Sequence, residues 1–591
     1  MASVKEVYEN SKIILPLSAF FTGFIIYRYL NWNIFSAQPL ALTLTLALVF
    51  TFLKSVRSVK QQALDYFLAT LSLVSGLYAV FFYEGIFNEA GNPSLITLIL
   101  GSIIVVLILE AVRRVYGWFL TVIIGAFVVY PFLGPYLFGT LRIRHFTYGR
   151  VIEAFYYQPD GLLGLPLDIC VSIVSIFVFM GICFGLSGAS NYMSNVALSV
   201  MGRSRGGPAK VAIICSSALG TITGSAAANV STTGVLTIPL MKKVGYLPHF
   251  AAAVEAVAST GGLIAPPVMG AAAFLMAEYL EVPYSIIMLA AAVPAFMYYL
   301  GLYLQVHFAA IRYNLTGVPE EDIPKLGDSW RVVYLIGVPF LLLVVSLAVF
   351  QQRPSISGGI AVLGLILVSY TAKETMLTPR RLLSALKQSV EPLIGVIVIS
   401  AAAGLVVGTM MLTNLGTTIT RTAFAVTGDF SLIALILVAV SAIILGMGMP
   451  ATPVYIILVF AAVPTLLKLG IDPLAAHLFV FYFGIMSFIT PPICVAVYVA
   501  SAIADSPPIK TAFSGLKLGI IGYLFPFIMA YFPQLLLVKG ELFRQIAGLF
   551  LCVIFVTGVS VGFSATTFHL ALRGTALAGS VVAIFLLTHV F

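Results

Sequence analysis

The sequence predicts an all-α polytopic membrane protein with about 15 membrane crossings, two re-entrant helical hairpins and an internal inverted repeat. Three observations predict it: the apolar composition, the length of the apolar runs, and a recurrence of prolines and glycines at one spacing. The chain has 591 residues, of which 60% are hydrophobic and only 9% charged, and its mean hydropathy is +1.08. Soluble domains carry about 25% charged residues. This composition places the chain in a lipid bilayer.

Apolar runs of roughly 17 to 25 residues predict membrane-spanning helices. The first bundle is expected near 13–31, 38–53, 67–84, 95–112 and 117–139. After a loop at 140–165, further spans are expected near 167–187, 284–310, 331–350, 356–373, 392–413, 430–446, 514–536, 542–563 and 573–591. The apolar stretches 208–279 and 446–503 are interrupted by Gly, Pro, Ser, Thr and Asn. They predict broken helices, because irregular backbone at membrane depth has to be buried in protein or line a wet cavity.

The charge pattern predicts an orientation with a cytoplasmic N-terminus. Basic residues gather in short segments between spans, so the net charge of +9 indicates membrane topology rather than a nucleic-acid partner. In this orientation the pairs Arg113 and Arg114, Lys242 and Lys243, and Arg380 and Arg381 are cytoplasmic, whereas Arg142, Arg144 and Arg150 face the other side. The five cysteines lie in apolar stretches without the spacing of a disulfide framework or a zinc site.

An internal repeat relates the two interrupted stretches at an offset of 225 residues. The matching pairs are Pro239 with Pro464, Lys243 with Lys468, Gly245 with Gly470, Pro248 with Pro473, Pro266 with Pro491 and Pro267 with Pro492. Five predicted crossings separate the starts of the two copies, near 167 and 392, so the second copy is inverted. Inverted repeats with paired broken helices are typical of transporters that alternate access between the two sides of a membrane.

The first hairpin, within GTITGSAAANVSTTGVLTIP, contains the first candidate binding residues. Gly224 permits tight backbone, and Ser225 and Asn229 supply oxygen atoms. Sodium and other hard cations prefer oxygen ligands, so a possible Na⁺ site is expected at the hairpin tips. Packing of small residues between helices uses the same residue types and is the alternative interpretation.

The interrupted span that follows offers a site for a carboxylate. Thr260, Gly261 and Gly262 mark the break, and Pro266 and Pro267 are expected to begin a new half-helix. The free amides at such a start bind anions. In the second copy the corresponding candidates are Gly446, Gly448, Pro450 and Thr452 at the hairpin and Thr490, Pro491 and Pro492 at the break, with Thr490 as the expected N-cap. A proline kink without a ligand is the alternative.

Glu255 is the carboxylate placed most deeply in these stretches, and an intramembrane ionisable group is a functional candidate by default. It could relay protons or help to hold sodium. The alternatives are an ion pair with a lysine such as Lys243 and a position nearer the interface. His477, in the second copy, is interpreted as a packing residue.

Three segments together resemble a known family. GSAAANVSTTGVLTIPLMKKVGY, AAAVEAVASTGGLIAPPVMGAAAFLMAEYLEVPY and ILGMGMPATPVYIILVF are similar to the large membrane subunit of tripartite ATP-independent periplasmic (TRAP) transporters, specifically the TAXI subfamily. EAVRRVYGW resembles the small membrane subunit fused ahead of it, and the resemblance covers about 10–535. Leu263 stands where similar sequences often have glutamine, so no side-chain hydrogen bond to a substrate is expected there.

The resemblance implies a domain organisation and an elevator mechanism. It predicts a small-subunit-like four-helix domain at 1–116, a connecting helix and loop at 117–165, a large-subunit-like transport domain at 166–540 and two additional helices at 541–591. The repeats within the transport domain run about 167–310 and 392–536. Family membership further implies a periplasmic TAXI-type binding protein as the partner that delivers substrate.

These features predict a secondary active transporter of the cell inner membrane rather than an enzyme. Neither an HExxH metal motif nor a nucleotide-binding P-loop occurs in the sequence, and no cofactor is expected beyond a coupling ion, Na⁺ or H⁺. The expected substrate is a small carboxylate or amino acid. The competing hypothesis is a stand-alone ion-coupled carboxylate symporter that needs no binding protein.

Overall fold

The computed structural model describes residues 37–54, 59–324, 333–427, 431–538, 540–563 and 570–590. Throughout these ranges the regular structure is helical and contains no strand, which confirms the all-α class. The span expected near 13–31 and the orientation of the N-terminus lie outside the described residues. The described chain divides into two compact units.

Many of the described helices are long and apolar enough to cross a bilayer. Within the described ranges nine pass this test, or ten when the bent pair α26 (Pro508–Leu518) and α27 (Ile520–Tyr531) counts as one span. The chain is therefore a multi-pass membrane protein. The helices expected near 331–350 and 356–373 are shorter, with 16 residues each in α17 (Val333–Ala348) and α18 (Pro354–Ser369), and the total of about 15 crossings stays a prediction.

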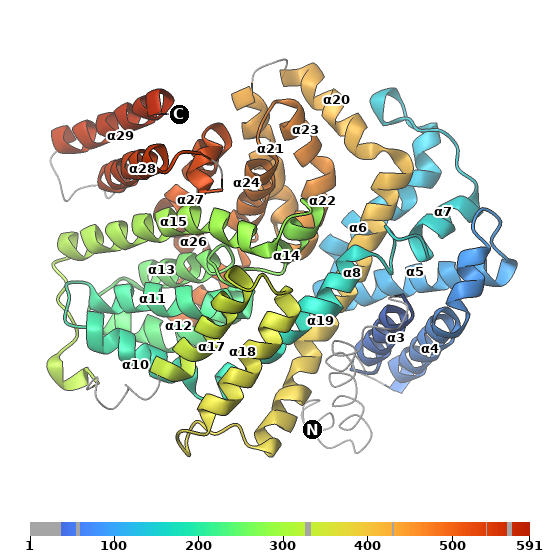
Figure 1. The fold of residues 1–591 in the computed structure, drawn as a ribbon, viewed down its shortest axis with the longest axis horizontal. Coiled ribbons are helices and arrows are strands. Elements are labelled where there is room, and N and C mark those ends of the chain that lie inside the picture. Colours follow the sequence, from blue (N-terminus) through green and yellow to red (C-terminus); the bar gives the residue numbers. More distant parts are fainter. Residues whose placement is uncertain are drawn as a thin grey trace. The chain divides into compact units, whose positions relative to one another are not determined.

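The first unit comprises Met1–Cys183, Leu377–Gly428 and Ile456–Thr465. Its helices are α3 (Ala37–Lys54), α4 (Val59–Asn88), α5 (Leu95–Tyr116), α6 (Trp118–Leu133), α7 (Tyr148–Tyr156), α8 (Leu165–Ile169), most of α9 (Ser175–Leu186), α19 (Pro379–Thr413) and α20 (Leu415–Thr427). The 35-residue α19 packs against α3, α5 and α6 (Figure 1). Segment 140–165, expected to be a loop, contains α7, which Thr147 caps by accepting a hydrogen bond from Arg150 N at 3.4 Å.

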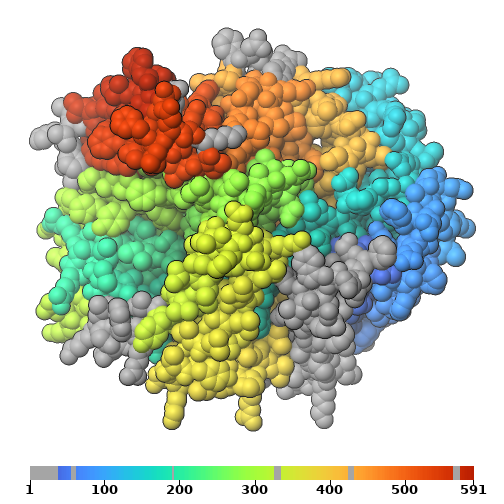
Figure 2. Space-filling view, viewed as in Figure 1, coloured from blue at the N-terminus to red at the C-terminus, as the bar shows by residue number. Residues whose placement is uncertain are grey.

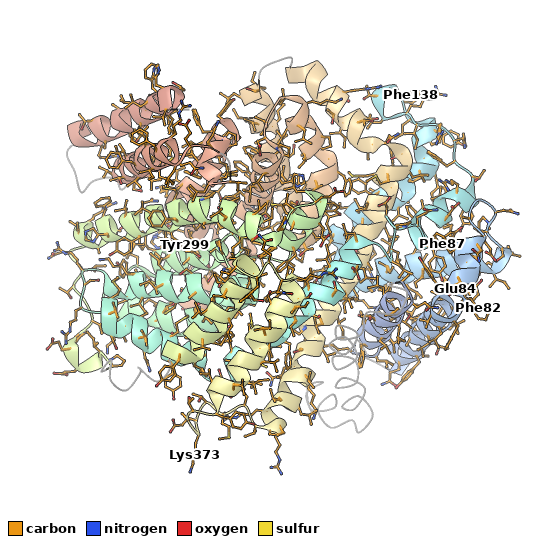
Figure 3. All side chains as sticks on the ribbon, viewed as in Figure 1. Phe82, Glu84, Phe87, Phe138, Tyr299 and Lys373 are labelled. Carbon is orange, nitrogen blue, oxygen red and sulfur yellow. The ribbon has the colours of Figure 1, made fainter. Side chains whose placement is uncertain are left out.

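A network of charged residues joins α4 and α5 of this unit. Glu110 accepts hydrogen bonds from Arg113 Nε and Nη2, both at 2.7 Å, and from Arg114 Nε at 2.7 Å. Arg114 Nη1 also reaches Asp65 Oδ1 on α4 at 2.5 Å, and the Asp65 side chain is only 3% exposed. Buried charges are tolerated when they are paired in this way. On the outer face of α4, Phe82 and Phe87 are exposed (Figure 3), as expected for side chains that meet lipid.

The second unit comprises Phe184–Met376, Asp429–Tyr455 and Leu466–Phe591. Besides α17, α18, α26 and α27, its helices are α10 (Ala189–Met201), α11 (Gly207–Thr223), α12 (Ala226–Lys243), α13 (Pro248–Gly261), α14 (Ala272–Tyr279), α15 (Tyr284–Arg312), α21 (Ser431–Gly446), α24 (Pro473–Met486), α25 (Val495–Ala504), α28 (Leu542–Phe563) and α29 (Leu570–Val590). The helices α22 (Ala451–Ala461) and α23 (Val463–Lys468) run from one unit into the other and back. α28 and α29 pack on each other, and α28 packs on α15 (Figures 1 and 2).

The predicted repeat recurs in the structure as well as in the sequence. α13 and α24 each have 14 residues and each begin at a proline, Pro248 and Pro473. Ahead of each helix a glycine takes a positive φ, 102° at Gly245 and 80° at Gly470, a backbone conformation that glycine adopts readily at helix ends. Both broken stretches consist of short helices, as predicted. The inversion of one copy relative to the membrane, and the predicted domain boundaries, stay predictions.

Candidate functional site

The first hairpin turns at Gly224 and Ser225, between α11 and α12. Gly224 has a φ of 60°, and the Ser225 side chain caps α12 by accepting a hydrogen bond from Ala228 N at 3.4 Å. Asn229, one turn into α12, is fully buried and donates from Nδ2 to Ser216 O on α11 at 2.7 Å. The predicted trio of Gly224, Ser225 and Asn229 thus lies at and just beyond the tip, with Asn229 facing the partner arm.

The hairpin arm α11 meets the break of the interrupted span through two glycines. A Cβ placed on Gly262 would lie 2.4 Å from Gly220 Cα, and a Cβ placed on Gly220 would lie 2.7 Å from Gly262 Cα. No side chain fits between them, because a real Cβ does not approach another backbone this closely. Glycine at both positions therefore allows α11 to lie directly on the break.

The second copy repeats this contact in its own hairpin. A Cβ on Gly446, at the end of α21, would lie 2.6 Å from Gly484 O and 2.6 Å from Ser487 Oγ. Ser487 lies 225 positions after Gly262 and directly follows α24, at the second break. The tip continues through Gly448, whose φ is 77°, to Pro450 and the buried Thr452. In both copies a glycine of the hairpin therefore rests on the interrupted span.

The two breaks differ from the predicted half-helix starts. Each proline pair, Pro266 with Pro267 and Pro491 with Pro492, contains a cis peptide bond and lies inside the irregular segment. The following helices begin later, α14 at Ala272 and α25 at Val495, so the expectation that a helix begins at the prolines is wrong. The irregular segment is longer than one turn because neither copy resumes helical hydrogen bonding directly after its prolines.

Thr490 is not an N-cap, since α25 is preceded by Cys494. Its hydroxyl instead donates to Met486 O at 2.7 Å, and it also lies 2.7 Å from the hydroxyl of Tyr523 on α27. Similarly, Thr260 Oγ1 in the first copy donates to Ala256 O at 2.7 Å. Both threonines thus close the last turn of the helix that precedes the break.

Tyrosines of α15 hold the first broken span in place. Tyr298 donates to Val257 O at 2.8 Å and Tyr299, labelled in Figure 3, donates to Ala258 O at 3.0 Å. Both rings also lie against Gly261, where a Cβ would come within 2.5 Å of Tyr298. Tyr284, at the start of the same helix, donates to Val268 O at 2.6 Å. Phenol groups of α15 therefore donate to backbone carbonyls on both sides of the break.

Glu255 is fully buried in a cage of hydroxyl groups, which we name the Glu255 cage: Ser216 on α11, Thr233 and Thr237 on α12, and Ser259 on α13. Oε1 accepts from Ser216 Oγ at 2.7 Å, from Ser259 Oγ at 3.1 Å and from Thr233 Oγ1, and Oε2 accepts from Thr237 Oγ1 at 2.6 Å. The carboxylate thus joins both arms of the hairpin to the first half of the interrupted span.

The four hydroxyl residues of the Glu255 cage were not among the predicted site residues. One signal was available: Thr233 and Thr237 are four residues apart, and residues at this spacing share one face of a helix. In the second copy no carboxylate stands at the position matching Glu255, which is Val480. There, His477 Nδ1 lies 2.7 Å from the buried Tyr455 hydroxyl, in agreement with its interpretation as a satisfied packing residue.

One buried oxygen near the first hairpin lacks a partner among the described residues. Asn229 Oδ1 is inaccessible to solvent and accepts no hydrogen bond from them. A buried amide oxygen normally has a donor, and leaving it unpaired costs about 1–3 kcal/mol. Since Asn229 Nδ2 is already used on Ser216 O, the oxygen is turned away from that contact. This orphaned oxygen is of the ligand type that hard cations prefer.

Within the second unit, some residues of the first copy contact residues of the second copy. Gly270, in the first break, lies against Phe481 of α24, since a Cβ there would be 3.8 Å from that ring. Lys242, at the end of α12, donates to Ala504 O at the end of α25 at 2.8 Å. Leu263 is buried and accepts a hydrogen bond through its backbone from Gly270 N at 2.9 Å. The roles of the individual candidates in binding stay predictions.

Comparison with known proteins identifies relatives. Residues 103–544 match the family model described as "Tripartite ATP-independent periplasmic transporter, DctM component". The sialic acid TRAP transporter large permease protein SiaM of Vibrio cholerae is 23% identical over 399 residues, which cover 66% of this chain and 90% of that protein. The C4-dicarboxylate TRAP transporter large permease protein DctM of Pseudomonas aeruginosa is 23% identical over 395 residues, which cover 64% of this chain and 89% of that protein.

A further relative is the isethionate TRAP transporter permease protein DctMQ of Oleidesulfovibrio alaskensis. It is 24% identical over 338 residues, which cover 57% of this chain. The chain matches about half of that relative's length, 52%. The relatives named above are transport proteins rather than enzymes. Since the family model covers most of the chain and the helical, multi-pass architecture agrees with it, the chain belongs to the TRAP transporter large permease (DctM) family.

Proposed function

We propose that the protein imports a small organic acid or amino acid across the cell inner membrane by an elevator mechanism, driven by a sodium or proton gradient. A periplasmic substrate-binding protein of the TAXI type delivers the substrate. The observation that carries this proposal is the pair of hairpins, each resting on a broken helix through a glycine, Gly220 on Gly262 and Gly446 on Ser487. Broken helices in two related halves are typical of secondary transporters.

The names of the relatives support the substrate class. They refer to sialic acid, a C4-dicarboxylate and isethionate, all of which are organic acids or their anions. Backbone amides in an irregular segment at membrane depth can bind an anionic group without a buried basic side chain. The irregular segments after Gly262 and Ser487 supply such backbone amides. Most of the selection among different acids is made by the binding protein.

The Glu255 cage supports a role for Glu255 in coupling, because its hydroxyls can satisfy either protonation state. When the carboxylate is ionised, the hydroxyls donate to it. When it is protonated, its own O–H donates to one hydroxyl, and the threonines can turn to backbone acceptors: Thr233 Oγ1 is 2.8 Å from Asn229 O and Thr237 Oγ1 is 3.1 Å from Thr233 O. A proton can therefore enter or leave without stranding a buried polar group.

Sodium is the alternative coupling ion, and one observation favours it. The orphaned Asn229 Oδ1 is a hard oxygen ligand close to the hairpin tip. The backbone carbonyl of Asn229 accepts a hydrogen bond from Thr233, a member of the Glu255 cage. A cation bound at Asn229 would therefore change the electrostatic environment of the cage, one helical turn away. Both ions thus remain within the proposal, and the imposed gradient distinguishes them.

Uptake into proteoliposomes tests the proposal. With the purified permease, its periplasmic partner and an inward sodium or proton gradient, we expect accumulation of a labelled organic acid. Without the partner, or with the gradient collapsed by an ionophore, we expect uptake at the level of protein-free liposomes. Uptake that needs the gradient but not the partner would favour the stand-alone carboxylate symporter instead.

A further inference from the structure

A polar cavity lies in the second unit, at the end of α13 opposite the break. It has a volume of about 210 Å³, well above the ~15 Å³ that one water molecule needs. We name it the basic pocket, and its lining residues are His249, Phe250, Gln305, Ala309, Arg312, Tyr313, Ser514, Lys517, Leu518 and Phe563. Four helices, α13, α15, α26 and α28, contribute to it, together with Tyr313, the residue directly after α15. Nothing in the transport proposal uses this cavity.

The charges of the basic pocket select for an anion. Arg312 and Lys517 are cations, His249 adds an imidazole, and the described residues of the lining include no aspartate or glutamate. His249 also belongs to the first turn of α13, where the free amides and the positive end of the helix dipole favour negative charge. Buried Gln305 fixes α26 by donating to Leu518 O at 2.9 Å, so the cationic groups are held around one space.

The position of the pocket indicates the surface of the bilayer. Arg312 is the last residue of α15 and Phe563 is the last residue of α28, and both helices are long and apolar enough to span a membrane. Phospholipid phosphate groups occupy this depth. Basic pockets between spans at this level are suited to anionic lipid headgroups.

An apolar border beside the cations completes the chemistry of a lipid. Phe250 packs between Tyr246, at a ring-centroid distance of 5.7 Å, and Tyr313, at 6.2 Å. Phe563, which lines the pocket, is 43% exposed and offers a surface for an acyl chain next to the charged groups. A free inorganic phosphate would gain nothing from this exposed ring.

We propose that the basic pocket binds the phosphate group of an anionic phospholipid, with Arg312 and Lys517 as its cationic ligands. Phe563 belongs to α28, most of which lies beyond the family match that ends at residue 544. The site is thus partly built from a helix that the family model does not cover. The bound lipid would join α28 to the start of α13, the helix that follows the first hairpin.

Lipid binding to the purified full-length protein tests this proposal. Delipidated wild-type protein and the Lys517→Gln and Arg312→Gln variants are titrated with phosphatidylglycerol, with zwitterionic phosphatidylcholine and with inorganic phosphate, and bound lipid is counted by native mass spectrometry. We expect phosphatidylglycerol to bind the wild type preferentially. Each substitution should weaken that binding roughly tenfold, since a hydrogen bond to a charged group contributes about that much.

Two controls keep the result specific. Lys373→Gln removes an exposed cation that follows α18 and does not line the pocket (Figure 3), and should leave binding unchanged. Lys517→Arg, which keeps the charge, should retain binding. Equal binding of phosphatidylglycerol by Lys517→Gln, Arg312→Gln and the wild type would overturn the proposal. Equivalent saturation of the site by inorganic phosphate, with no preference for phosphatidylglycerol, would overturn the lipid assignment.

Discussion

Replacing Gly262 by alanine should abolish uptake while leaving the rest of the helices folded. The added Cβ would lie 2.4 Å from Gly220 Cα, and backbone cannot move aside as a flexible side chain can. Gly262 itself has a φ of −59°, which alanine adopts without strain. The expected loss therefore comes from the contact and not from the backbone, with about 1–3 kcal/mol of destabilisation from overpacking. The measurement is initial uptake rate in proteoliposomes together with thermal stability.

A matched substitution separates this contact from a general effect of adding a methyl group. Gly337→Ala, in α17 of the same unit, meets no atom within 4 Å and should leave uptake unchanged. Its stability should stay the same or rise slightly, because alanine favours a helix more than glycine does. Normal uptake by Gly262→Ala would show that the hairpin need not rest on the break, and would remove the main support for the proposed function.

Glu255→Gln should give a folded protein that has lost its response to the coupling ion. Glutamine has nearly the shape of glutamate, and its amide can still donate and accept within the Glu255 cage. The charge and the exchangeable proton are lost, so we expect gradient-driven uptake to fall to the level of protein-free liposomes. Exchange of substrate between the two sides, which needs no net ion movement, should survive. Both rates can be measured in proteoliposomes with the partner protein present.

Controls for this substitution lie in the same unit. Glu278→Gln removes an exposed carboxylate at the end of α14 and should keep full coupling. Thr237→Val removes one donor to Glu255 Oε2 and should shift the pH dependence of uptake without abolishing it. If Glu255→Gln kept wild-type dependence on both sodium and pH, Glu255 would act only as a structural carboxylate.

Much of the architecture follows from patterns that depend on the local chain. Apolar runs predicted α5, α15 and α28 to within a few residues, because a bilayer sets the length of a spanning helix. The repeat paired Gly245 with Gly470, and both take a positive φ in the structure, because a helix end that needs this conformation selects glycine. These features need no knowledge of which helices touch.

Features that depend on distant contacts could not be predicted in this way. Three polar partners of Glu255 lie on α11 and α12, 39, 22 and 18 residues before it: Ser216, Thr233 and Thr237. Only the packing of these helices brings them to Glu255. The fourth partner, Ser259, lies four residues after Glu255 on the same helix. Helix starts at Ala272 and Val495 were also missed, because the proline rule concerns a proline in the first turn of a helix, whereas here each proline pair lies inside an irregular segment. Glu255 is fully buried, and its role stays a prediction that the test above addresses.

The packing of α28 on α15 has a practical consequence for work on this protein. Gly301 of α15 faces Val556 of α28, and Ser560 of α28 donates to Gly301 O at 3.5 Å. α28 therefore covers the surface of α15 around Gly301. α15 also carries Tyr298, which donates to the first broken span. A shortened protein that ends at residue 544, where the family match ends, would expose this surface of α15 to detergent. We expect such a truncation to aggregate on gel filtration, so expression designs should retain the last two helices.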